Sequence, residues 1–181
     1  MPILGIMASA MSANLWQPQG AYDALSTVTV GTTAVSSITF AGIPNTYKHL
    51  QIRAFCLNSG QDTLYMSYNG DTTGANYRDH QVGGNASSVF AYSNAGTSSG
   101  AGIGLTSQTA GAGNIIDILD YANTSKNKTA RSLWGVDRNG AGSVGLFSSL
   151  WVNTSAVNSI TFSVGTYPFQ QYSQFTLYGV K

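Results

Sequence analysis

The stretch Leu50-Gln51-Ile52-Arg53-Ala54-Phe55-Cys56 decides the fold, because an apolar residue recurs at every second position. Successive side chains of a strand point to opposite faces, so alternate residues share a face. The apolar face of this predicted strand carries Leu50, Ile52, Ala54 and Cys56. Residues 62–68 repeat the pattern and gather Leu64, Met66 and Tyr68 on one face. Neighbouring strands that each have an apolar face indicate a sheet that covers a core.

The same strand signals continue in both directions from this stretch. Short runs of β-branched and aromatic residues are separated by Gly, Asn, Asp and Pro, which favour turns. Further strands are predicted at residues 25–30, 35–40, 115–121, 130–136, 144–152, 159–164 and 174–180. Asp137-Arg138-Asn139-Gly140 has the Asn-Gly chemistry of a tight hairpin turn. Residues 69–113 are poorly patterned, and we expect short strands there near 89–92 and 103–107, between long exposed loops.

The spacing of these segments indicates the architecture. About ten or eleven short strands at regular intervals are typical of an all-β, antiparallel two-sheet sandwich, and most of all of a jelly-roll-like one. The β-sandwich domain is predicted to cover residues 21–181 and to follow an extended N-terminal arm over residues 1–20.

The composition indicates a weakly charged, hydroxyl- and amide-rich surface. The chain has no Glu, and its 181 residues include only 8 basic and 7 acidic ones. Ser, Thr and Asn compete for backbone hydrogen bonds and favour strands and turns over helices. A formal charge of +1 provides no basic face, so no nucleic-acid partner is predicted. Such a surface suits a protein embedded among many copies of its neighbours.

The first residues are predicted to form an assembly arm. Residues 2–11 are apolar and end in Ala8-Ser9-Ala10, as in a signal peptide, but no Lys or Arg precedes Lys48. The segment is too short to span a bilayer, so no membrane insertion is predicted. The arm is expected to bury these apolar side chains against a different chain: Ile3, Leu4, Ile6, Met7, Leu15 and Trp16.

Asp117 and Asp120 could form the carboxylate pair of a glycosidase. Their separation of three residues, however, puts them on opposite faces of a strand. We expect one of them to be buried and paired, with Arg131 or Arg53, and the other to be solvated.

Asn69, Asp71 and Asp79 lie in a Gly-rich stretch and could bind a hard cation such as calcium. An EF-hand-type loop needs a bidentate Glu, which this chain lacks. The alternative is a loop in which Asn69 and Asp71 hold their own backbone through Asx turns. No metal ion and no other cofactor is predicted.

No residue pattern predicts an enzyme. Arg78-Asp79-His80 could supply part of a catalytic triad, but no G-x-S-x-G turn accompanies it. His49 and His80 are the only histidines and Cys56 the only cysteine, too few for an ordinary structural zinc site or for a disulfide. Cys56 is expected to be a small buried thiol. Sequons of the type N-x-[ST] are interpreted as chance matches, at Asn85, Asn123, Asn127 and Asn153.

Most of the ten tyrosines are expected to belong to the core and to cross-strand pairs. Tyr77 and Tyr92 fall in the poorly patterned region and could contact a glycan or a partner from its loops. A tyrosine suits this role because it combines a rigid apolar face with a polar tip.

Four stretches resemble a family of structural proteins from tailed bacteriophages, frequent in marine and cyanophage-like sequences. They are SITFAGIPNTYKHLQIR at 37–53, DILDYANT at 117–124, FTLYGVK at 175–181 and MPILGI at 1–6. The resemblance implies a virion structural or tail-fibre-like protein of β-sandwich type, without an assigned catalytic site.

These observations predict a non-enzymatic virion protein that assembles in the host cytoplasm. The favoured position is that of a capsid-decorating (cement) protein, whose arm contacts the major capsid protein. The alternative is a tail-fibre or receptor-binding appendage that joins a tail adaptor and adheres to host surface glycans. The weak surface charge favours association, so a homo-oligomer is expected, and a trimer in particular.

Overall fold

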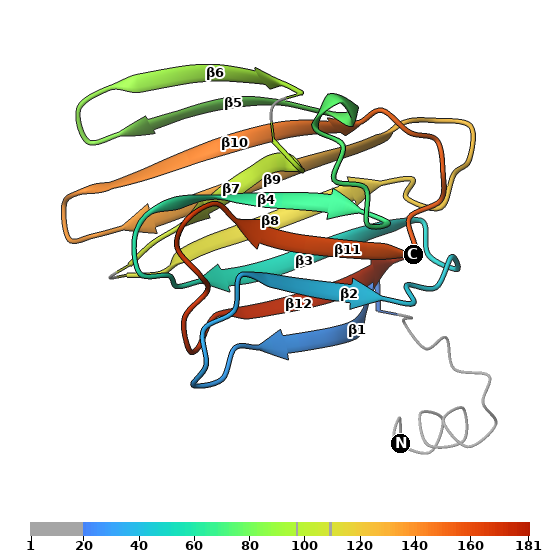
Figure 1. Cartoon of the computed structure of the whole chain (residues 1–181), viewed down its shortest axis with the longest axis horizontal. Coiled ribbons are helices and arrows are strands. Elements are labelled where there is room, and N and C mark those ends of the chain that lie inside the picture. The colour runs from blue at the N-terminus through green and yellow to red at the C-terminus, as the bar shows by residue number, and fades with distance from the viewer. Residues whose placement is uncertain (1–19, 97, 109) are drawn as a thin grey trace, which may run out of the picture.

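The computed structural model describes residues 20–96, 98–108 and 110–181, so the predicted arm residues from Ile3 to Trp16 lie outside the described part of the chain. The described residues form an all-β sandwich of two antiparallel sheets (Figure 1). Its strands are β1 (Tyr22–Thr29), β2 (Ser37–Ala41), β3 (His49–Cys56), β4 (Asp62–Tyr68), β5 (Tyr77–Asn85), β6 (Val89–Ala95), β7 (Ala101–Thr106), β8 (Ala112–Leu119), β9 (Lys128–Asp137), β10 (Gly142–Trp151), β11 (Ser159–Val164) and β12 (Gln174–Val180). One short 3₁₀ helix, η1 (Gly74–Asn76), precedes β5. The predicted fold class is confirmed.

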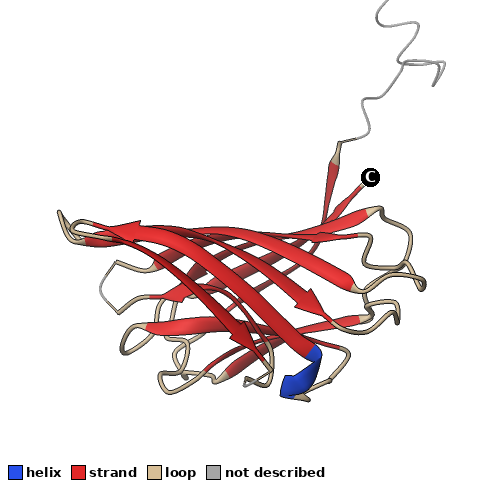
Figure 2. Ribbon diagram, turned by 90° about the horizontal axis from the view of Figure 1, so that it is seen from above, coloured by secondary structure: helices blue, strands red, loops and turns tan. Residues whose placement is uncertain are grey.

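The strand order is that of a jelly roll with two added hairpins. The large sheet runs β1-β12-β3-β8-β9-β10-β5-β6, and the small sheet runs β2-β11-β4-β7. Without the hairpins β5–β6 and β9–β10, eight strands remain, in the sheets β1-β12-β3-β8 and β2-β11-β4-β7. When these eight are renumbered in chain order, the two sheets run 1-8-3-6 and 2-7-4-5. This is the double Greek key of a jelly roll. Both added hairpins extend the large sheet beyond β8, so it reaches well past the small one (Figure 1). Figure 2 shows the two layers edge-on.

The core lies between the small sheet and the part of the large sheet that it covers. The inward side chains predicted for β3 and β4 are all buried: Leu50, Ile52, Ala54, Cys56, Leu64, Met66 and Tyr68. Phe162 of β11 packs against Phe175 of β12, with ring centroids 5.1 Å apart. The alternation that predicts these strands therefore reflects burial of one face between two layers.

Side chains of the large sheet satisfy the open edge of the small sheet. β7 forms that edge, and polar residues of the large sheet bind its outward backbone groups: Asp79, Asn114, Ser132 and Ser149. Asp79 accepts a hydrogen bond from Gly102 N (3.0 Å), and Ser149 Oγ donates to Gly102 O (2.7 Å). Asn114 binds both backbone groups of Leu105. An unpaired strand edge is thereby closed without another strand.

The middle of the chain differs most from the sequence prediction. Of the two or three short strands expected there, β6 and β7 match the two that were placed. The residues of β5 were expected in an exposed loop, which is wrong. They are buried only at Tyr77 and Asp79 and become half-buried or exposed beyond them. With no second layer over its far end, β5 carries no alternating apolar pattern. Elsewhere, the predicted hairpin turn between β9 and β10 is confirmed, because Asn139 and Gly140 both have positive φ, at 56° and 93°.

Candidate functional site on the outer face of the large sheet

The outer face of the large sheet, which points away from the small sheet, is apolar at its centre. We call four of its residues the apolar row: Ile115 of β8, Leu133 of β9, Leu146 of β10 and Val82 of β5. They are consecutive cross-strand neighbours in the register. Each remains between 43% and 54% exposed. Antiparallel sheets usually present polar side chains on a solvated face, so this row is unusual.

Further apolar side chains widen the row on one side. They are Phe55, Val144 and Val89, exposed by 43%, 55% and 89%. Between them lie glycines, since Val144 is opposite Gly135 on β9 and Gly84 on β5. The surface is hollowed by about 610 Å³ beside Leu133 and Phe55, and by about 660 Å³ beside Leu146. A contiguous exposed apolar surface of this kind is a candidate interaction site.

A polar row runs along the other side of the apolar row. Its members are cross-strand neighbours: Gln51, Asp117, Arg131, Ser148 and His80. Gln51 Nε2 donates to Asp117 Oδ1 (2.8 Å), and Arg53 Nε donates to Gln51 Oε1 (3.0 Å). The Arg53 guanidinium also lies over the rings of Tyr22 and Tyr178, 5.8 and 5.2 Å from their centroids. The outer face therefore combines an apolar centre with a polar flank that carries both charge signs.

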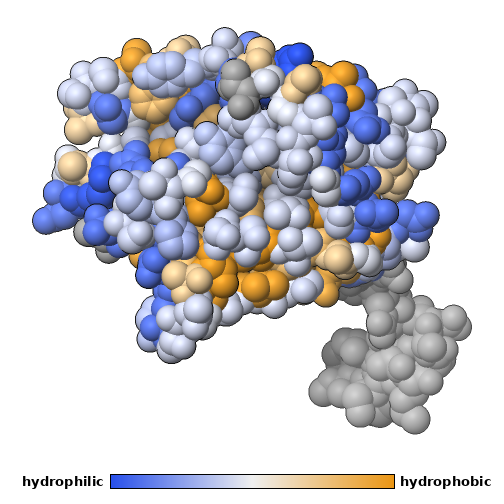
Figure 3. All heavy atoms as spheres, viewed as in Figure 1, coloured by the Kyte–Doolittle hydropathy of each residue, from blue (hydrophilic) through white to orange (hydrophobic). Residues whose placement is uncertain are grey.

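The outer face of the small sheet has a different character. Its outward positions on β2 and β11 carry hydroxyl groups: Ser37, Thr39, Thr161 and Ser163. The hydroxyls of Thr39 and Thr161 share a hydrogen bond of 2.9 Å. Figure 3 shows this side of the molecule, where hydrophilic and weakly polar side chains cover most of the surface. The apolar row thus distinguishes the large sheet.

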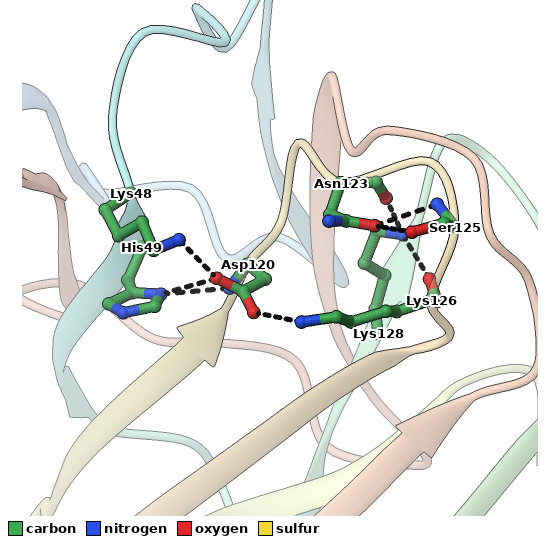
Figure 4. A network of polar contacts seen from close by, with 7 residues as sticks. All are labelled: Lys48, His49, Asp120, Asn123, Ser125, Lys126 and Lys128. Atoms are coloured by element: carbon green, nitrogen blue, oxygen red, sulfur yellow. Dashed lines mark hydrogen bonds and ion pairs between the residues drawn. The ribbon is translucent and has the colours of Figure 1, made fainter.

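Asp117 and Asp120 do not form a carboxylate pair. Asp117 lies in the polar row, whereas Asp120 lies in the turn after β8, with a φ of 48°. Asp120 forms ion pairs with Lys126 (3.0 Å) and Lys48 (3.3 Å) (Figure 4). Hydrogen bonds from Lys126, and then from Lys48, lower the pKa of Asp120. The expectation that one aspartate is buried and paired with Arg131 or Arg53 is thus wrong: Asp120 pairs with lysines, and Asp117 is half-buried and accepts a hydrogen bond from Gln51.

Lys128 joins two loops at the same end of the large sheet. Figure 4 shows its contacts with the turn before β9, to Asn123 and Lys126. Lys128 is only 1% exposed, and its Nζ donates to three backbone carbonyls, those of Asn123, Lys126 and Thr154. Burial lowers the pKa of this amine. A buried cation held by carbonyl oxygens alone fixes the turn before β9 against the loop after β10, which is a structural role.

The Asp71 carboxylate holds its own loop and the core. Its Oδ1 accepts a hydrogen bond from Thr73 N (2.9 Å), which confirms the predicted Asx turn. Its Oδ2 accepts from Asn76 Nδ2 and Trp151 Nε1, both at 2.8 Å. Burial raises the pKa of Asp71, but the hydrogen bonds from Trp151, Asn76 and Thr73 together outweigh burial and hold the pKa at about 2.

Asn69 and Asp79 do not join Asp71 in a cation site. Asn69 binds the distant loop before β11 through Asn158 N (2.9 Å) and Ala156 O (2.8 Å), so the Asx turn predicted for it is wrong. Asp79 instead accepts a hydrogen bond from Gly102 N of β7. No group of three His, Cys, Asp or Glu residues in the described part of the chain is placed to hold a metal ion.

Tyr77 and Tyr92 are placed differently. Tyr77 is only 2% exposed, and its hydroxyl donates to Asp71 O (2.7 Å) and accepts from Tyr68 N (3.1 Å). This corrects the prediction for Tyr77, because its ring and its hydroxyl are both engaged in the core. Tyr92 is 65% exposed on β6, and its ring stacks on that of Phe90 with centroids 5.5 Å apart.

Tyr92 borders a groove of about 170 Å³ between the extension of the large sheet and the edge of the small sheet. Its lining combines aromatic, amide and hydroxyl side chains, among them Tyr65, Gln81, Asn94 and Thr63. An exposed aromatic face beside amide groups is suited to a sugar ring.

The remaining candidates are structural in this fold. Asp79 and His80 are adjacent in β5, so their side chains lie on opposite faces and share no triad. Cys56 is fully buried, which raises the pKa of its thiol and confirms the predicted buried state. Three of the four sequons are Asx turns, in which Asn Oδ1 accepts from the amide two residues on: Asn85 to Ser87, Asn123 to Ser125 and Asn153 to Ser155.

The apolar row was not predicted, although the sequence contains a signal for it. Ile115-Ile116, Leu133-Trp134 and Leu146-Phe147 are adjacent apolar pairs within strands. Adjacent residues of a strand face opposite sides, so such a pair makes both faces apolar. The inner members fill the interior, and the outer members form three of the four positions of the row, with Val82 as the fourth.

Comparison with protein-family models found no match, and neither did comparison with curated proteins. Among solved structures, a mutant of alginate lyase Aly36B in complex with alginate trisaccharide is 11% identical, covers 88% of each chain and has a TM-score of 0.30. A homodimeric agglutinin from chicken liver is 9% identical over 80% of this chain and 100% of its own, with a TM-score of 0.19. These likenesses are too distant to decide a function. In the described residues, no helix is long and apolar enough to cross a membrane.

Proposed function

We propose that this chain is a non-enzymatic structural protein of a bacteriophage virion that acts by assembling with other chains through the outer face of the large sheet. The apolar row is the observation that carries the proposal. Its four side chains are only half-buried, although apolar area removed from water contributes roughly 25 cal/mol per Å². A partner laid on this face would gain that free energy without rearranging the core.

The composition of the rest of the surface supports the same function. With 8 basic and 7 acidic residues in 181, neighbouring copies repel one another weakly. Hydroxyl groups cover the outer face of the small sheet, where they can form hydrogen bonds with any neighbour. A rigid sandwich with one apolar face and one hydroxyl-rich face suits a protein that is packed into a lattice.

Within the virion, we propose a capsid-decorating (cement) protein whose N-terminal arm contacts the major capsid protein. The alternative position is a tail appendage that joins a tail adaptor. Quantitative mass spectrometry of purified particles tests both. A copy number that matches the capsid lattice supports decoration, and a copy number that matches the few tail positions supports the appendage. Absence of the protein from purified particles would reject the virion function.

A second candidate function, adhesion to a host surface glycan, is favoured by Tyr92. Its exposed ring is supported from behind by Phe90, and Gln81 and Asn94 line the groove beside it. The test is a glycan array probed with the full chain and with Tyr92→Ala. Binding that is lost in Tyr92→Ala supports adhesion, whereas no binding by the unmodified chain rejects it.

A further inference from the structure

We infer that the outer face of the large sheet pairs with the same face of a second copy of this chain, about a two-fold axis. The inference deepens the proposed function, because it names the partner of the apolar row. The inference concerns the assembly unit and not the position of that unit on a particle. The two-fold pairing and the virion function can therefore fail independently.

The order of the side chains across the face is what makes it self-complementary. The six strands run β3-β8-β9-β10-β5-β6, and the centre of this series lies between β9 and β10. A two-fold axis along the strands at that centre, in the plane between two facing copies, exchanges β9 with β10, β8 with β5, and β3 with β6. Leu133 of one copy then faces Leu146 of the other, and Ile115 faces Val82. The apolar row therefore meets itself along its whole length.

The neighbouring row, which contains Phe55, Val144 and Val89, also faces its own copy in a complementary way. The same axis sets Phe55 against Val89 and Val144 against Gly135. The side chain of Val144 thus enters a position where the other copy has no side chain. Interlocking of this kind is what packed sheets require at a separation of roughly 10 Å.

The polar row introduces no repulsion between copies. The axis sets Arg131 against Ser148 and Asp117 against His80. No charge on these rows meets its own kind, although each copy carries both signs there. A copy of the chain is thus an acceptable partner for this face on electrostatic grounds as well.

The available area is sufficient for a stable pair. Six strands spaced by about 4.8 Å, each about eight residues long at roughly 3.3 Å per residue, present roughly 750 Å² per copy. Stable interfaces bury roughly 800 Å² per partner, so the face has the size that a specific dimer needs. A contact of this type is isologous and closes at two copies.

The full chain in solution tests the inference by sedimentation velocity at micromolar concentrations. We expect a dimer. Leu133→Lys places a charge at the centre of the contact and is expected to raise the dissociation constant by roughly 30-fold or more. Ser37→Lys adds the same charge to the outer face of the small sheet and is the matched control, which should remain dimeric.

A second variant separates loss of pairing from loss of folding. Gly135 lies on the exposed face, and a Cβ at this position would meet only Ser143 O at 3.8 Å and the Val144 side chain at 3.9 Å within its own chain. Gly135→Ile should therefore leave the monomer folded, and β-branched residues favour strands. It fills the position that receives Val144 of the other copy, so it should dissociate the dimer while circular dichroism is unchanged.

Several results would overturn the inference. A monomeric unmodified chain would do so, including the case in which the arm of the same chain covers the face. A trimer that Leu133→Lys and Gly135→Ile leave intact would place self-association on another surface. The trimer expected from the sequence would need such a surface, because the two-fold contact closes at two copies. If the chain is found in purified particles but is monomeric in solution, the proposed function stands and the two-fold pairing fails.

Discussion

Asp71 and Asp79 lie eight residues apart, and their pKa values shift in opposite directions. Asp71 is half-buried and Asp79 is buried. Asp71 accepts hydrogen bonds from Thr73, Asn76 and Trp151, which together hold its pKa at about 2. For Asp79 burial dominates and raises the pKa, with the hydrogen bonds from Gly102 and Asn94 acting against it. The balance between burial and the donors that face a carboxylate decides whether its charge stabilises the fold.

The first prediction concerns Asp71. A pKa below the usual 3.8 means that the ionised form stabilises the folded state above about pH 4, and that this contribution is lost as the pH falls toward about 2. Asp71→Asn removes acceptor sites from Trp151 and its other donors, and should lower the free energy of unfolding at pH 7 by about 1–3 kcal/mol. Urea unfolding followed by tryptophan fluorescence between pH 2 and pH 7 measures it. An unchanged acid dependence in the variant would contradict the assignment.

The second prediction concerns Asp79 and has the opposite sign. Because its pKa is raised, the ionised form costs stability above the folded-state pKa, and stability is gained as the pH falls through that value. Asp79→Asn keeps an acceptor for Gly102 N without the buried charge, so its melting temperature at pH 7 should equal or exceed that of the unmodified chain. Asp79→Ala leaves the amide without that acceptor and should cost about 1–3 kcal/mol. A lower melting temperature for Asp79→Asn than for Asp79→Ala would refute this account.

At the scale of elements, β7 shows how a sandwich can close one side without another strand. Its backbone groups bind side chains of the large sheet, and its glycines leave room for them. A Cβ on Gly104 would overlap the side-chain oxygen of Asn114, which caps Leu105. The glycines of β7 are therefore a condition for the polar closure of this edge.

The third prediction tests that closure. Gly104→Ala should displace the Asn114 amide and lower the free energy of unfolding by about 1–3 kcal/mol, because buried polar groups lose their partners. Gly113→Ala on β8 is the matched control, since a Cβ there meets nothing within 4 Å. It should change stability by no more than about 0.5 kcal/mol. Chemical unfolding measures both variants. If the free energy of unfolding falls equally in both, the hydrogen bonds from Asn114 to β7 do not contribute to stability.

The same elements explain how far the sequence alone predicts the structure. β3 and β4 could be predicted because their inner faces are covered by the opposite sheet, which imposes alternation. β5 could not, because most of it has no second layer to bury it. Tyr77 was wrongly predicted to lie in a loop for a related reason. It begins β5, and without an alternating pattern the sequence does not distinguish a buried tyrosine from an exposed one. The outer face could not be predicted, because an adjacent apolar pair such as Leu133-Trp134 does not show which member is left uncovered.

At the scale of the whole molecule, the fourth prediction concerns the segment before β1. Deleting residues 1–18 should leave the sandwich folded, because the described strands supply the core among themselves. Far-ultraviolet circular dichroism should be unchanged by the deletion. If the deleted segment anchors the protein, its loss should abolish incorporation into particles. Full occupancy of particles by the truncated chain would reject the anchoring role.

The burial of Cys56 gives this molecule an internal reporter of its own opening. The chain has one cysteine, which lies between the two sheets with no exposed surface. A thiol reagent can reach it only after the layers separate, and burial also disfavours the reactive thiolate. At high reagent concentration, the rate of labelling becomes the rate at which the sandwich opens. The lifetime of the closed jelly roll can therefore be timed in the unmodified chain, free or within any assembly that it forms.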